Sequence, residues 1–225
     1  MTYPGLFRVS ATVVAAILAA ILLTTAAFAT GAGAQPCSGT VLLDPGHGGT
    51  DPGAVNTKYG LTEKEQTLVV ANRLRSLLVA DGCTVYMTRT LNSQTLSNND
   101  RYAYANAKGA DVLVSVHMNG STNPSTDYTT TLFGKWRKDK ELANTVFGSL
   151  STLPAANGTG TIGTRTPYSF ASGVLLKSNM PATIAETVVI TNDREGQLLS
   201  NGTGTRQQQI AQALRVGIEN YLATH

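Results

Sequence analysis

The chain has 225 residues, with 17 Lys and Arg against 14 Asp and Glu and a formal net charge of +3. This weak positive charge, without a run of basic residues or an aromatic platform, argues against a nucleic-acid-binding protein. Beyond the first 34 residues about 190 remain, which is enough for one well-buried core.

The first segment, residues 1–34, has the pattern of an export signal. It carries one charge, Arg8, followed by the apolar run 9–23 and the small-residue patterns 27–29 and 32–34. We predict a cleaved signal peptide over 1–34 and a catalytic or binding domain over 35–225 that is secreted, periplasmic or in the cell wall. The alternative is an uncleaved anchor, because the apolar stretch is just long enough to span a bilayer.

Strand and helix signals alternate from residue 40 onward. Short apolar runs predict strands at 40–43, 84–88, 112–116, 129–133, 173–176 and 183–190. Helical periodicity predicts helices at 63–80, 99–108, 138–150, 193–199 and 205–223. Thr62 and Glu65 have the spacing of a capping box for the first helix. The alternation predicts a single α/β domain, in which a mostly parallel twisted sheet has helices on both faces.

The cysteine count is two, Cys37 and Cys83, and each precedes a predicted strand. An even count in an exported chain predicts a disulfide between them. Two unpaired thiols are the alternative. Neither cysteine belongs to a C-x-x-C pattern, which disfavours a zinc ribbon or a redox motif.

Two of the three histidines, His47 and His117, follow short apolar strands directly. Because the carboxyl ends of parallel strands meet at one edge of a sheet, where α/β proteins bind their ligands, the two imidazoles predict one metal site at that edge. Glu63, at the start of the first long helix, is a candidate third ligand, and Glu65 competes with it. Two His and one Glu form a recognised catalytic zinc set.

Each of these residues also has a structural interpretation. A histidine at a strand end is often a hydrogen-bonded core residue, and Glu63 could be a helix-start charge. Asp44 and Asp51 could form turns or orient His47. Glu186 lies within an apolar strand, where a carboxylate is either salt-bridged or placed to carry protons beside a metal.

Four blocks of the sequence resemble one known family. They are Leu43-Asp44-Pro45-Gly46-His47-Gly48-Gly49-Thr50-Asp51-Pro52-Gly53-Ala54, Gly60-Leu61-Thr62-Glu63-Lys64-Glu65, Ala110-Asp111-Val112-Leu113-Val114-Ser115-Val116-His117-Met118-Asn119 and Met180-Pro181-Ala182-Thr183-Ile184-Ala185-Glu186. In this order they resemble the zinc-dependent N-acetylmuramoyl-L-alanine amidases (the Amidase_3 family), over about 40–222. The chain is similar to small actinobacterial members without a wall-binding domain, and the resemblance implies an amidase catalytic domain over 35–225.

The resemblance implies roles for four residues. His47, Glu63 and His117 would hold one Zn²⁺, and Glu186 would be the catalytic glutamate. The implied substrate is peptidoglycan or its muropeptide fragments, cut between N-acetylmuramic acid and L-alanine. Zinc would activate water and polarise the carbonyl, while Glu186 would pass a proton to the leaving nitrogen.

The sequence departs from the family pattern after two of the motifs. Thr-Val-Val follows Glu186 where the family has Thr-Gly-Phe, and Met118-Asn119-Gly120 stands where it has Ala-Asn-Ala. The long stretch 152–172, rich in Gly and Thr, is predicted to be a functional loop, with Arg165 as a candidate contact for a substrate carboxylate.

Two other functions remain open from the sequence. One is a zinc peptidase that cuts within stem peptides. The other is a non-catalytic or activator-dependent wall-binding protein on the same fold. We expect a monomer, with no nucleic-acid partner and with membrane contact only through the signal segment.

Overall fold

The centre of the fold is a six-stranded sheet in the order β4-β1-β5-β8-β6-β7, seen in a computed structural model that describes Met1 and residues 37–225. Its strands are β1 (Thr40–Pro45), β4 (Thr84–Met87), β5 (Val112–Asn119), β6 (Thr130–Phe133), β7 (Tyr168–Ser169) and β8 (Ala182–Val189). Only the β6–β8 pair is antiparallel, so the prediction of a mostly parallel sheet is confirmed.

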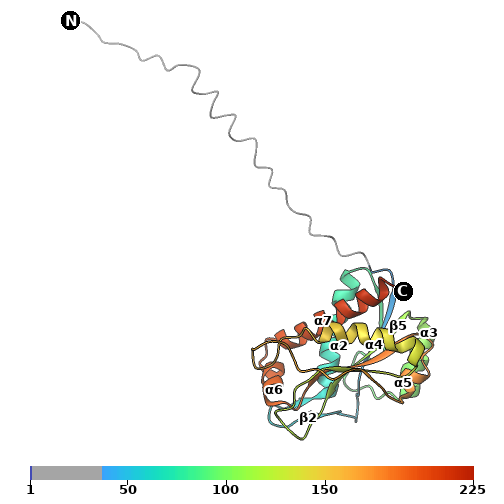
Figure 1. The fold of residues 1–225 in the computed structure, drawn as a ribbon, viewed down its shortest axis with the longest axis horizontal. Helices are drawn as coiled ribbons and strands as arrows, with labels where there is room; N and C mark the ends of the chain where they lie inside the picture. Colours follow the sequence, from blue (N-terminus) through green and yellow to red (C-terminus); the bar gives the residue numbers. More distant parts are fainter. Residues whose placement is uncertain (2–36) are drawn as a thin grey trace. The chain divides into compact units, whose positions relative to one another are not determined.

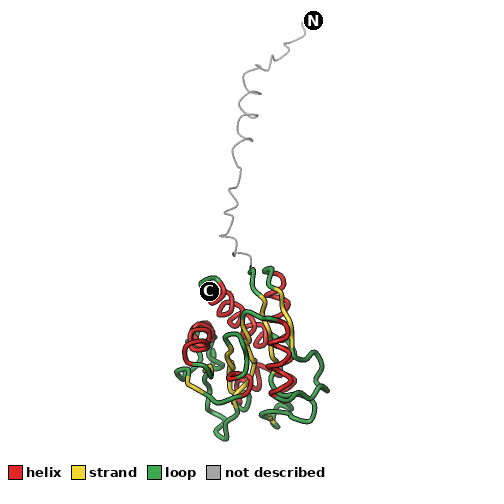
Figure 2. The backbone as a smooth tube through the Cα atoms, turned by 90° about the vertical axis from the view of Figure 1, so that its right-hand side faces the viewer, coloured by secondary structure: helices red, strands yellow, loops and turns green. Residues whose placement is uncertain are grey.

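Helices cover both faces of this sheet (Figures 1 and 2). The helices are α2 (Glu63–Ala80), α3 (Asn98–Lys108), α4 (Trp136–Leu150), α5 (Gly173–Leu176), α6 (Asp193–Ser200) and α7 (Thr205–Leu222). On one face the long helix α7 packs against both α2 and α4, and α3 contacts α5 on the other. The predicted arrangement of helices on both faces is confirmed.

Alternation along the strands divides the core between these two faces. On β5, Val112 and Val114 pack into the larger cluster beneath α2, α4 and α7, whereas Leu113 packs with α3 and α5. Because side chains two residues apart share a face, Ser115 and His117 continue the α3/α5 side. On β1 the same argument places Asp44 with Leu42 on that side. Asp44, Ser115 and His117 therefore continue the α3/α5 face of the sheet toward its carboxyl edge.

Three local predictions need correction. Residues 173–176, predicted as a strand, form the short helix α5, because a four-residue apolar run does not distinguish a strand from a helical turn. Thr62 is the N-cap of α2, but its hydroxyl donates to Glu65 (Oγ1–Oε2 2.8 Å) and makes no capping bond to the backbone. The predicted loop 152–172 contains the edge strand β7.

A short hairpin was not predicted either. Strands β2 (Val55–Asn56) and β3 (Leu61–Thr62) pair antiparallel in the connection from β1 to α2. The hairpin leads directly into α2, and the backbone N–H of Glu63 donates to the carbonyl of Ala54 (2.9 Å). It therefore fixes where the first turn of α2 begins.

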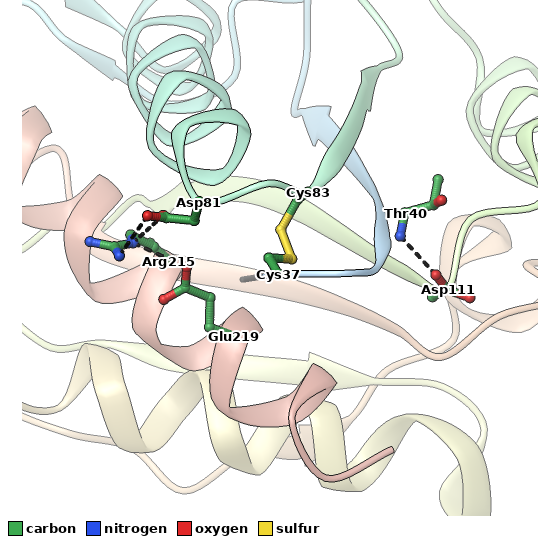
Figure 3. Close-up of a disulfide and its surroundings, with 7 residues drawn as sticks. All are labelled: Cys37, Thr40, Asp81, Cys83, Asp111, Arg215 and Glu219. Atoms are coloured by element: carbon green, nitrogen blue, oxygen red, sulfur yellow. Dashed lines mark hydrogen bonds and ion pairs between the residues drawn. A yellow bond between two sulfur atoms is a disulfide. The ribbon is translucent and has the colours of Figure 1, made fainter. Parts of the chain in front are cut away.

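A disulfide joins Cys37 to Cys83 and ties the segment before β1 to the segment before β4 (Figure 3). Nearby, Arg215 of α7 pairs with Asp81 (Nε–Oδ2 2.6 Å), which is the C-cap of α2. The backbone N–H of Thr40 donates to Asp111 (2.7 Å). All of these contacts lie at the amino edge of the parallel strands, opposite the edge that carries His47 and His117.

The described residues from 37 onward belong to one compact unit, Gln35–His225. The export signal predicted over 1–34 lies outside the described residues, except for Met1. Among the helices of the described part, none combines the length and apolar character needed to cross a bilayer.

Candidate metal centre

The two histidines meet because their strands are parallel neighbours. Asp44 pairs with Ser115 and Pro45 with Val116, so β1 ends beside the residue that precedes His117 on β5. The rings of His47 and His117 lie edge to face with their centroids 4.8 Å apart. Gly46 permits this approach, since a Cβ at that position would lie 2.4 Å from the His117 ring. The predicted meeting of the two imidazoles at one sheet edge is what the structure shows.

Glu63 lies between the two imidazoles. Its Oε2 is 3.1 Å from Nε2 of His47, and its Oε1 is 3.0 Å from Nδ1 of His117. Backbone N–H groups of Ala54 and Met118 also donate to the carboxylate, each at 2.9 Å. These four contacts hold the buried side chain of Glu63, the first residue of α2, in the site.

The competing carboxylate, Glu65, does not share this position. Its Oε2 accepts from the hydroxyl of Thr62, on the first turn of α2. The donor atoms of His47, Glu63 and His117 all lie within 4.8 Å of one another, and no other such cluster occurs among the described residues. Two imidazole nitrogens and one carboxylate oxygen are a donor set that suits a divalent transition metal such as zinc.

Charge stabilises this arrangement. Burial raises the pKa of Glu63, but hydrogen bonds from His117 and His47 outweigh burial and hold that pKa far below its usual value. Burial lowers the pKa of His47, but Glu63 and Asp51 outweigh it and raise the pKa to about 9. His117 also has a raised pKa, because its hydrogen bond to Glu63 prevails over burial. The Glu63 carboxylate thus favours positive charge on both rings, in the place where a metal ion would supply it.

Asp51 orients His47 from outside the cluster. Its Oδ2 lies 2.8 Å from Nδ1 of His47, and its Oδ1 accepts from the backbone N–H of Gly53 at 3.0 Å. His47 itself has a left-handed backbone with φ of 62°, directly before the turn closed by the Gly48–Asp51 bridge. Both sequence interpretations of Asp51 therefore apply, since it forms a turn and also holds the imidazole that faces Glu63.

Asp44 is not part of the donor set. It is buried, and it accepts from Arg101, Thr88 and Ser115, each at 2.6 Å. Burial raises the pKa of Asp44, but Arg101 and the two hydroxyls outweigh it and lower the pKa. Arg101 also donates to the carbonyl of His47 (2.9 Å), so the pair holds the loop that carries this histidine.

Arg89 supports the loops of the site, although no sequence pattern predicted a role for it. Its buried guanidinium donates to the carbonyls of Pro45 (2.9 Å), Gly46 (2.8 Å) and Lys64 (2.7 Å). It therefore joins the loop after β1 to the start of α2, which carry His47 and Glu63. The sequence feature that could have indicated this role is the position of Arg89 directly after a predicted strand, which neighbours β1 in the sheet.

Glu186 lies on β8 and is the register partner of His117 on β5. Burial raises its pKa, and among the described residues its carboxylate forms no ion pair. This environment excludes the interpretation of Glu186 as a salt-bridged structural residue. It leaves a carboxylate with an elevated proton affinity beside the three candidate ligands.

The three candidate ligands and Glu186 line one cleft with a volume of about 480 Å³, together with Asp44, Asp51 and Arg101. A second hollow of about 580 Å³, between α4 and α7, has no titratable side chain in its lining. The three candidate ligands and Glu186 therefore share one cleft, at the carboxyl edge of the sheet.

Comparison with known proteins decides the family. The sequence profile of N-acetylmuramoyl-L-alanine amidase matches residues 41–220. The chain belongs to this family. It is 30% identical to amidase AmiA of Salmonella typhimurium over 222 residues, covering 80% of this chain and 75% of that protein. It is 32% identical to the uncharacterized YqiI of Bacillus subtilis, covering 84% of this chain and 87% of that protein.

Solved amidase structures share this fold. The N-acetylmuramoyl-L-alanine amidase of Clostridium difficile 630 matches with a TM-score of 0.74 at 32% identity, covering 84% of this chain and 98% of that one. Ami1 of Mycobacterium smegmatis matches with a TM-score of 0.69 at 22% identity, covering 85% and 100%, which supports the fold alone. The family and these relatives identify the chain as an enzyme, an amidase with the predicted α/β architecture.

The departures from the family motif leave the donor set of this amidase intact. Met118 stands where the family has alanine, but it contributes its backbone N–H to Glu63, which any non-proline residue can supply. Arg165, the candidate carboxylate contact, is exposed, and its guanidinium carbon lies 3.7 Å over the ring centroid of Tyr128. Its contact with a substrate stays a prediction.

Proposed function

We propose that this amidase hydrolyses the amide bond between the lactyl group of N-acetylmuramic acid and L-alanine in peptidoglycan stem peptides, with one zinc ion held by His47, Glu63 and His117. The observation that carries the proposal is the position of the Glu63 carboxylate, 3.0–3.1 Å from both imidazoles in the only titratable cluster of its kind in the described chain. The substrate class rests on the family and on the relatives named as amidases.

The residues around the cleft have separate roles in the proposed reaction. Zinc, when bound, supplies a Lewis acid that makes water acidic and polarises a carbonyl. His47 and His117 offer nitrogen donors and Glu63 offers an anionic oxygen, while Asp51 and the backbone N–H of Met118 fix their orientation. Because the three donors come from β1, α2 and β5, the fold itself assembles the set.

Glu186 carries the proton. In this proposal its carboxylate takes a proton from the attacking water and transfers it to the nitrogen of L-alanine as the C–N bond breaks. The water oxygen becomes part of the lactyl carboxylate, and the peptide leaves with a free amino group. Its raised pKa favours this role, because a carboxylate with higher proton affinity is a better acceptor.

Export and action outside the cytoplasm are part of the same proposal. The pattern of residues 1–34 supports a cleaved signal peptide. The Cys37–Cys83 disulfide supports an oxidising compartment, and the relatives include a probable cell wall amidase of Staphylococcus epidermidis. We propose that the mature protein is a monomer in the cell wall or periplasm.

Product analysis tests the proposed reaction. The purified protein is incubated with peptidoglycan, and soluble products are identified by mass spectrometry. We expect stem peptides with a free N-terminal L-alanine, together with glycan that keeps intact muramic acid. Cleavage between two amino acids of the stem would identify a peptidase instead, and the absence of cleavage by a zinc-loaded sample would indicate a need for an activator.

A further inference from the structure

The floor of the cleft is one register row that crosses the sheet. Asp44 pairs with Ser115, Ser115 with Ile184, Ile184 with Leu132, and Leu132 with Tyr168. Register partners on adjacent strands point to the same face, and all five residues line the cleft. The cleft therefore extends over β1, β5, β8, β6 and β7, well beyond the three candidate metal ligands.

The chemistry of this row changes from one end to the other. Asp44 and Ser115 are buried and hydrogen-bonded to each other. Ile184 and Leu132 form an apolar middle with 7% and 4% exposure. Tyr168, at the β7 end, is 48% exposed. A cleft that is polar at one end and apolar at the other suits a ligand with two chemically different parts.

A second aromatic ring enlarges the apolar end. Phe170 follows Tyr168 by two residues, so the alternation of an extended chain places both on one side, and both line the cleft. Phe170 is also 48% exposed. Its backbone N–H donates to the carbonyl of Phe133 (2.9 Å), which holds this segment against the sheet edge. Two half-exposed rings on a fixed edge strand form a wall that a ligand can cover.

This aromatic wall, Tyr168 and Phe170, shares the cleft with the candidate proton carrier Glu186. Ile184 lies two residues before Glu186 on β8 and pairs with Leu132, the register partner of Tyr168. A ligand whose reacting bond lies at Glu186 can therefore extend an adjoining part over the wall, because both line the same cleft. In a muramyl peptide, the two parts next to the scissile amide are the amino sugar and the stem peptide.

The wall matches the sugar better than the peptide. A pyranose presents a face of C–H groups, which pack against the electron-rich face of an aromatic ring. Stem peptides carry carboxylates, yet no lysine lines the described cleft, and Arg101, its one guanidinium, is paired with buried Asp44. A carboxylate over Leu132 and Ile184 would lose its hydration without gaining a cation.

We propose that Tyr168 and Phe170 form a sugar subsite, in which the amino-sugar ring next to the scissile amide stacks on the aromatic wall. This inference rests on the proposed function for the identity of the substrate. It adds that the enzyme selects muramyl peptides through the glycan side of the bond.

Two substrates that differ only in the sugar test this subsite. N-acetylmuramoyl-L-alanyl-D-isoglutamine contains the ring, and N-lactyl-L-alanyl-D-isoglutamine offers the same amide without it. We expect Tyr168→Ala and Phe170→Ala each to raise KM for the first substrate by about 3–10-fold, with kcat changed less than about 2-fold. KM for the second substrate should stay within about 2-fold of the wild-type value.

Control variants separate stacking from general damage. Tyr104→Ala removes a partly exposed tyrosine of α3 that does not line the cleft, and it should leave both KM values unchanged. Tyr168→Phe keeps the ring and should retain the wild-type preference. Equal KM increases for both substrates, or no change for either, would overturn the sugar subsite.

A binding measurement distinguishes failure of the subsite from failure of the proposed reaction. Peptide-free glycan fragments of N-acetylglucosamine and N-acetylmuramic acid are titrated into the protein and followed by calorimetry. We expect binding that is weakened in Tyr168→Ala and Phe170→Ala but kept in Tyr104→Ala. Glycan binding through the two rings without hydrolysis of either substrate would overturn the proposed reaction and leave the subsite standing. Glycan binding that is as strong in Tyr168→Ala and Phe170→Ala as in the wild type would overturn the subsite alone.

Discussion

His117 and Glu186 are register partners on the neighbouring parallel strands β5 and β8, so a candidate metal ligand and a candidate proton carrier project side by side from one face of the sheet. Their roles differ because their neighbours differ. His117 lies 3.0 Å from Glu63, whereas Glu186 has no ion-pair partner in the described chain, and burial raises its pKa. This contrast predicts that substitutions of Glu63 and of Glu186 have different effects on metal binding and on the reaction.

Glu186→Gln should keep the metal and lose the reaction. The amide has a similar shape but cannot accept the proton from water, so we expect kcat to fall by about 10²–10⁴-fold. Metal content, measured by mass spectrometry of the purified variant, should remain at the wild-type level. A variant with bound metal and full activity would remove Glu186 from the mechanism.

Glu63→Gln and Glu65→Gln form a matched pair on the first turn of α2. Glu63 lies between the two imidazoles, and Glu65 accepts from Thr62, so only the first substitution should weaken metal binding. We expect at least a 10-fold rise in the zinc dissociation constant for Glu63→Gln and less than a 2-fold change for Glu65→Gln, measured by competition with a chelator. The reverse pattern would reassign the carboxylate ligand to Glu65.

Asp51→Ala should weaken metal binding without removing a ligand. Asp51 accepts from Nδ1 of His47 and so holds the ring whose Nε2 faces Glu63. Loss of such an orienting carboxylate typically reduces metal affinity by about 10–100-fold. The same chelator competition measures this change, and an unaltered affinity would show that the Gly48–Asp51 turn alone positions His47.

The buried pair of Asp44 and Arg101 predicts a pH-dependent stability. Arg101 and two hydroxyls hold the pKa of Asp44 below its unfolded value of 3.8 despite burial, which raises it. A carboxyl whose pKa is lowered on folding stabilises the protein above its unfolded pKa, and this stability is lost as the pH falls through the folded pKa. The wild-type protein should therefore lose stability below about pH 4.

Asp44→Asn removes this dependence together with the pair. At neutral pH the variant should be about 3 kcal/mol less stable, because the guanidinium of Arg101 stays buried without its counter-charge. Urea unfolding between pH 7 and pH 3 measures both effects. Parallel stability curves for the variant and the wild type across this range would contradict the assignment to Asp44.

Loss of the disulfide should affect stability and spare the active site. Cys37 and Cys83 are 46 residues apart, and the chain-entropy account gives about 4 kcal/mol for a loop of this length. The bond lies at the amino edge of the strands, opposite the candidate metal centre. We expect the Cys37→Ser/Cys83→Ser double variant to unfold at lower urea and to keep kcat within about 2-fold at 25 °C. A large loss of kcat in the folded variant would show coupling between the two edges.

The donor set could be predicted from the sequence because it follows from local patterns. His47 and His117 each come directly after an apolar run, and the parallel arrangement of those runs brings their ends together. Glu63 begins a helix whose amphipathic pattern is clear in the sequence. Local patterns therefore predicted the two histidines and left Glu63 and Glu65 as alternatives, between which the resemblance to the family favoured Glu63.

The aromatic wall could not be predicted in the same way. β7 has two residues, and its position comes from pairing with β6, a contact between segments about 35 residues apart that leaves no local pattern. The prediction of a strand at 173–176 was wrong for a related reason, since four apolar residues fit a strand or a helical turn equally well. Arg89 was missed as a support because its partners are backbone carbonyls, which the sequence does not distinguish.

Anomalous X-ray scattering at the zinc absorption edge, from crystals of the protein grown with zinc, tests the central claim most directly. We predict one anomalous peak, located among His47, Glu63 and His117, with Glu186 near the metal but not bound to it. A peak ligated by Glu65 or by Glu186, or no peak at this cluster, would contradict the account.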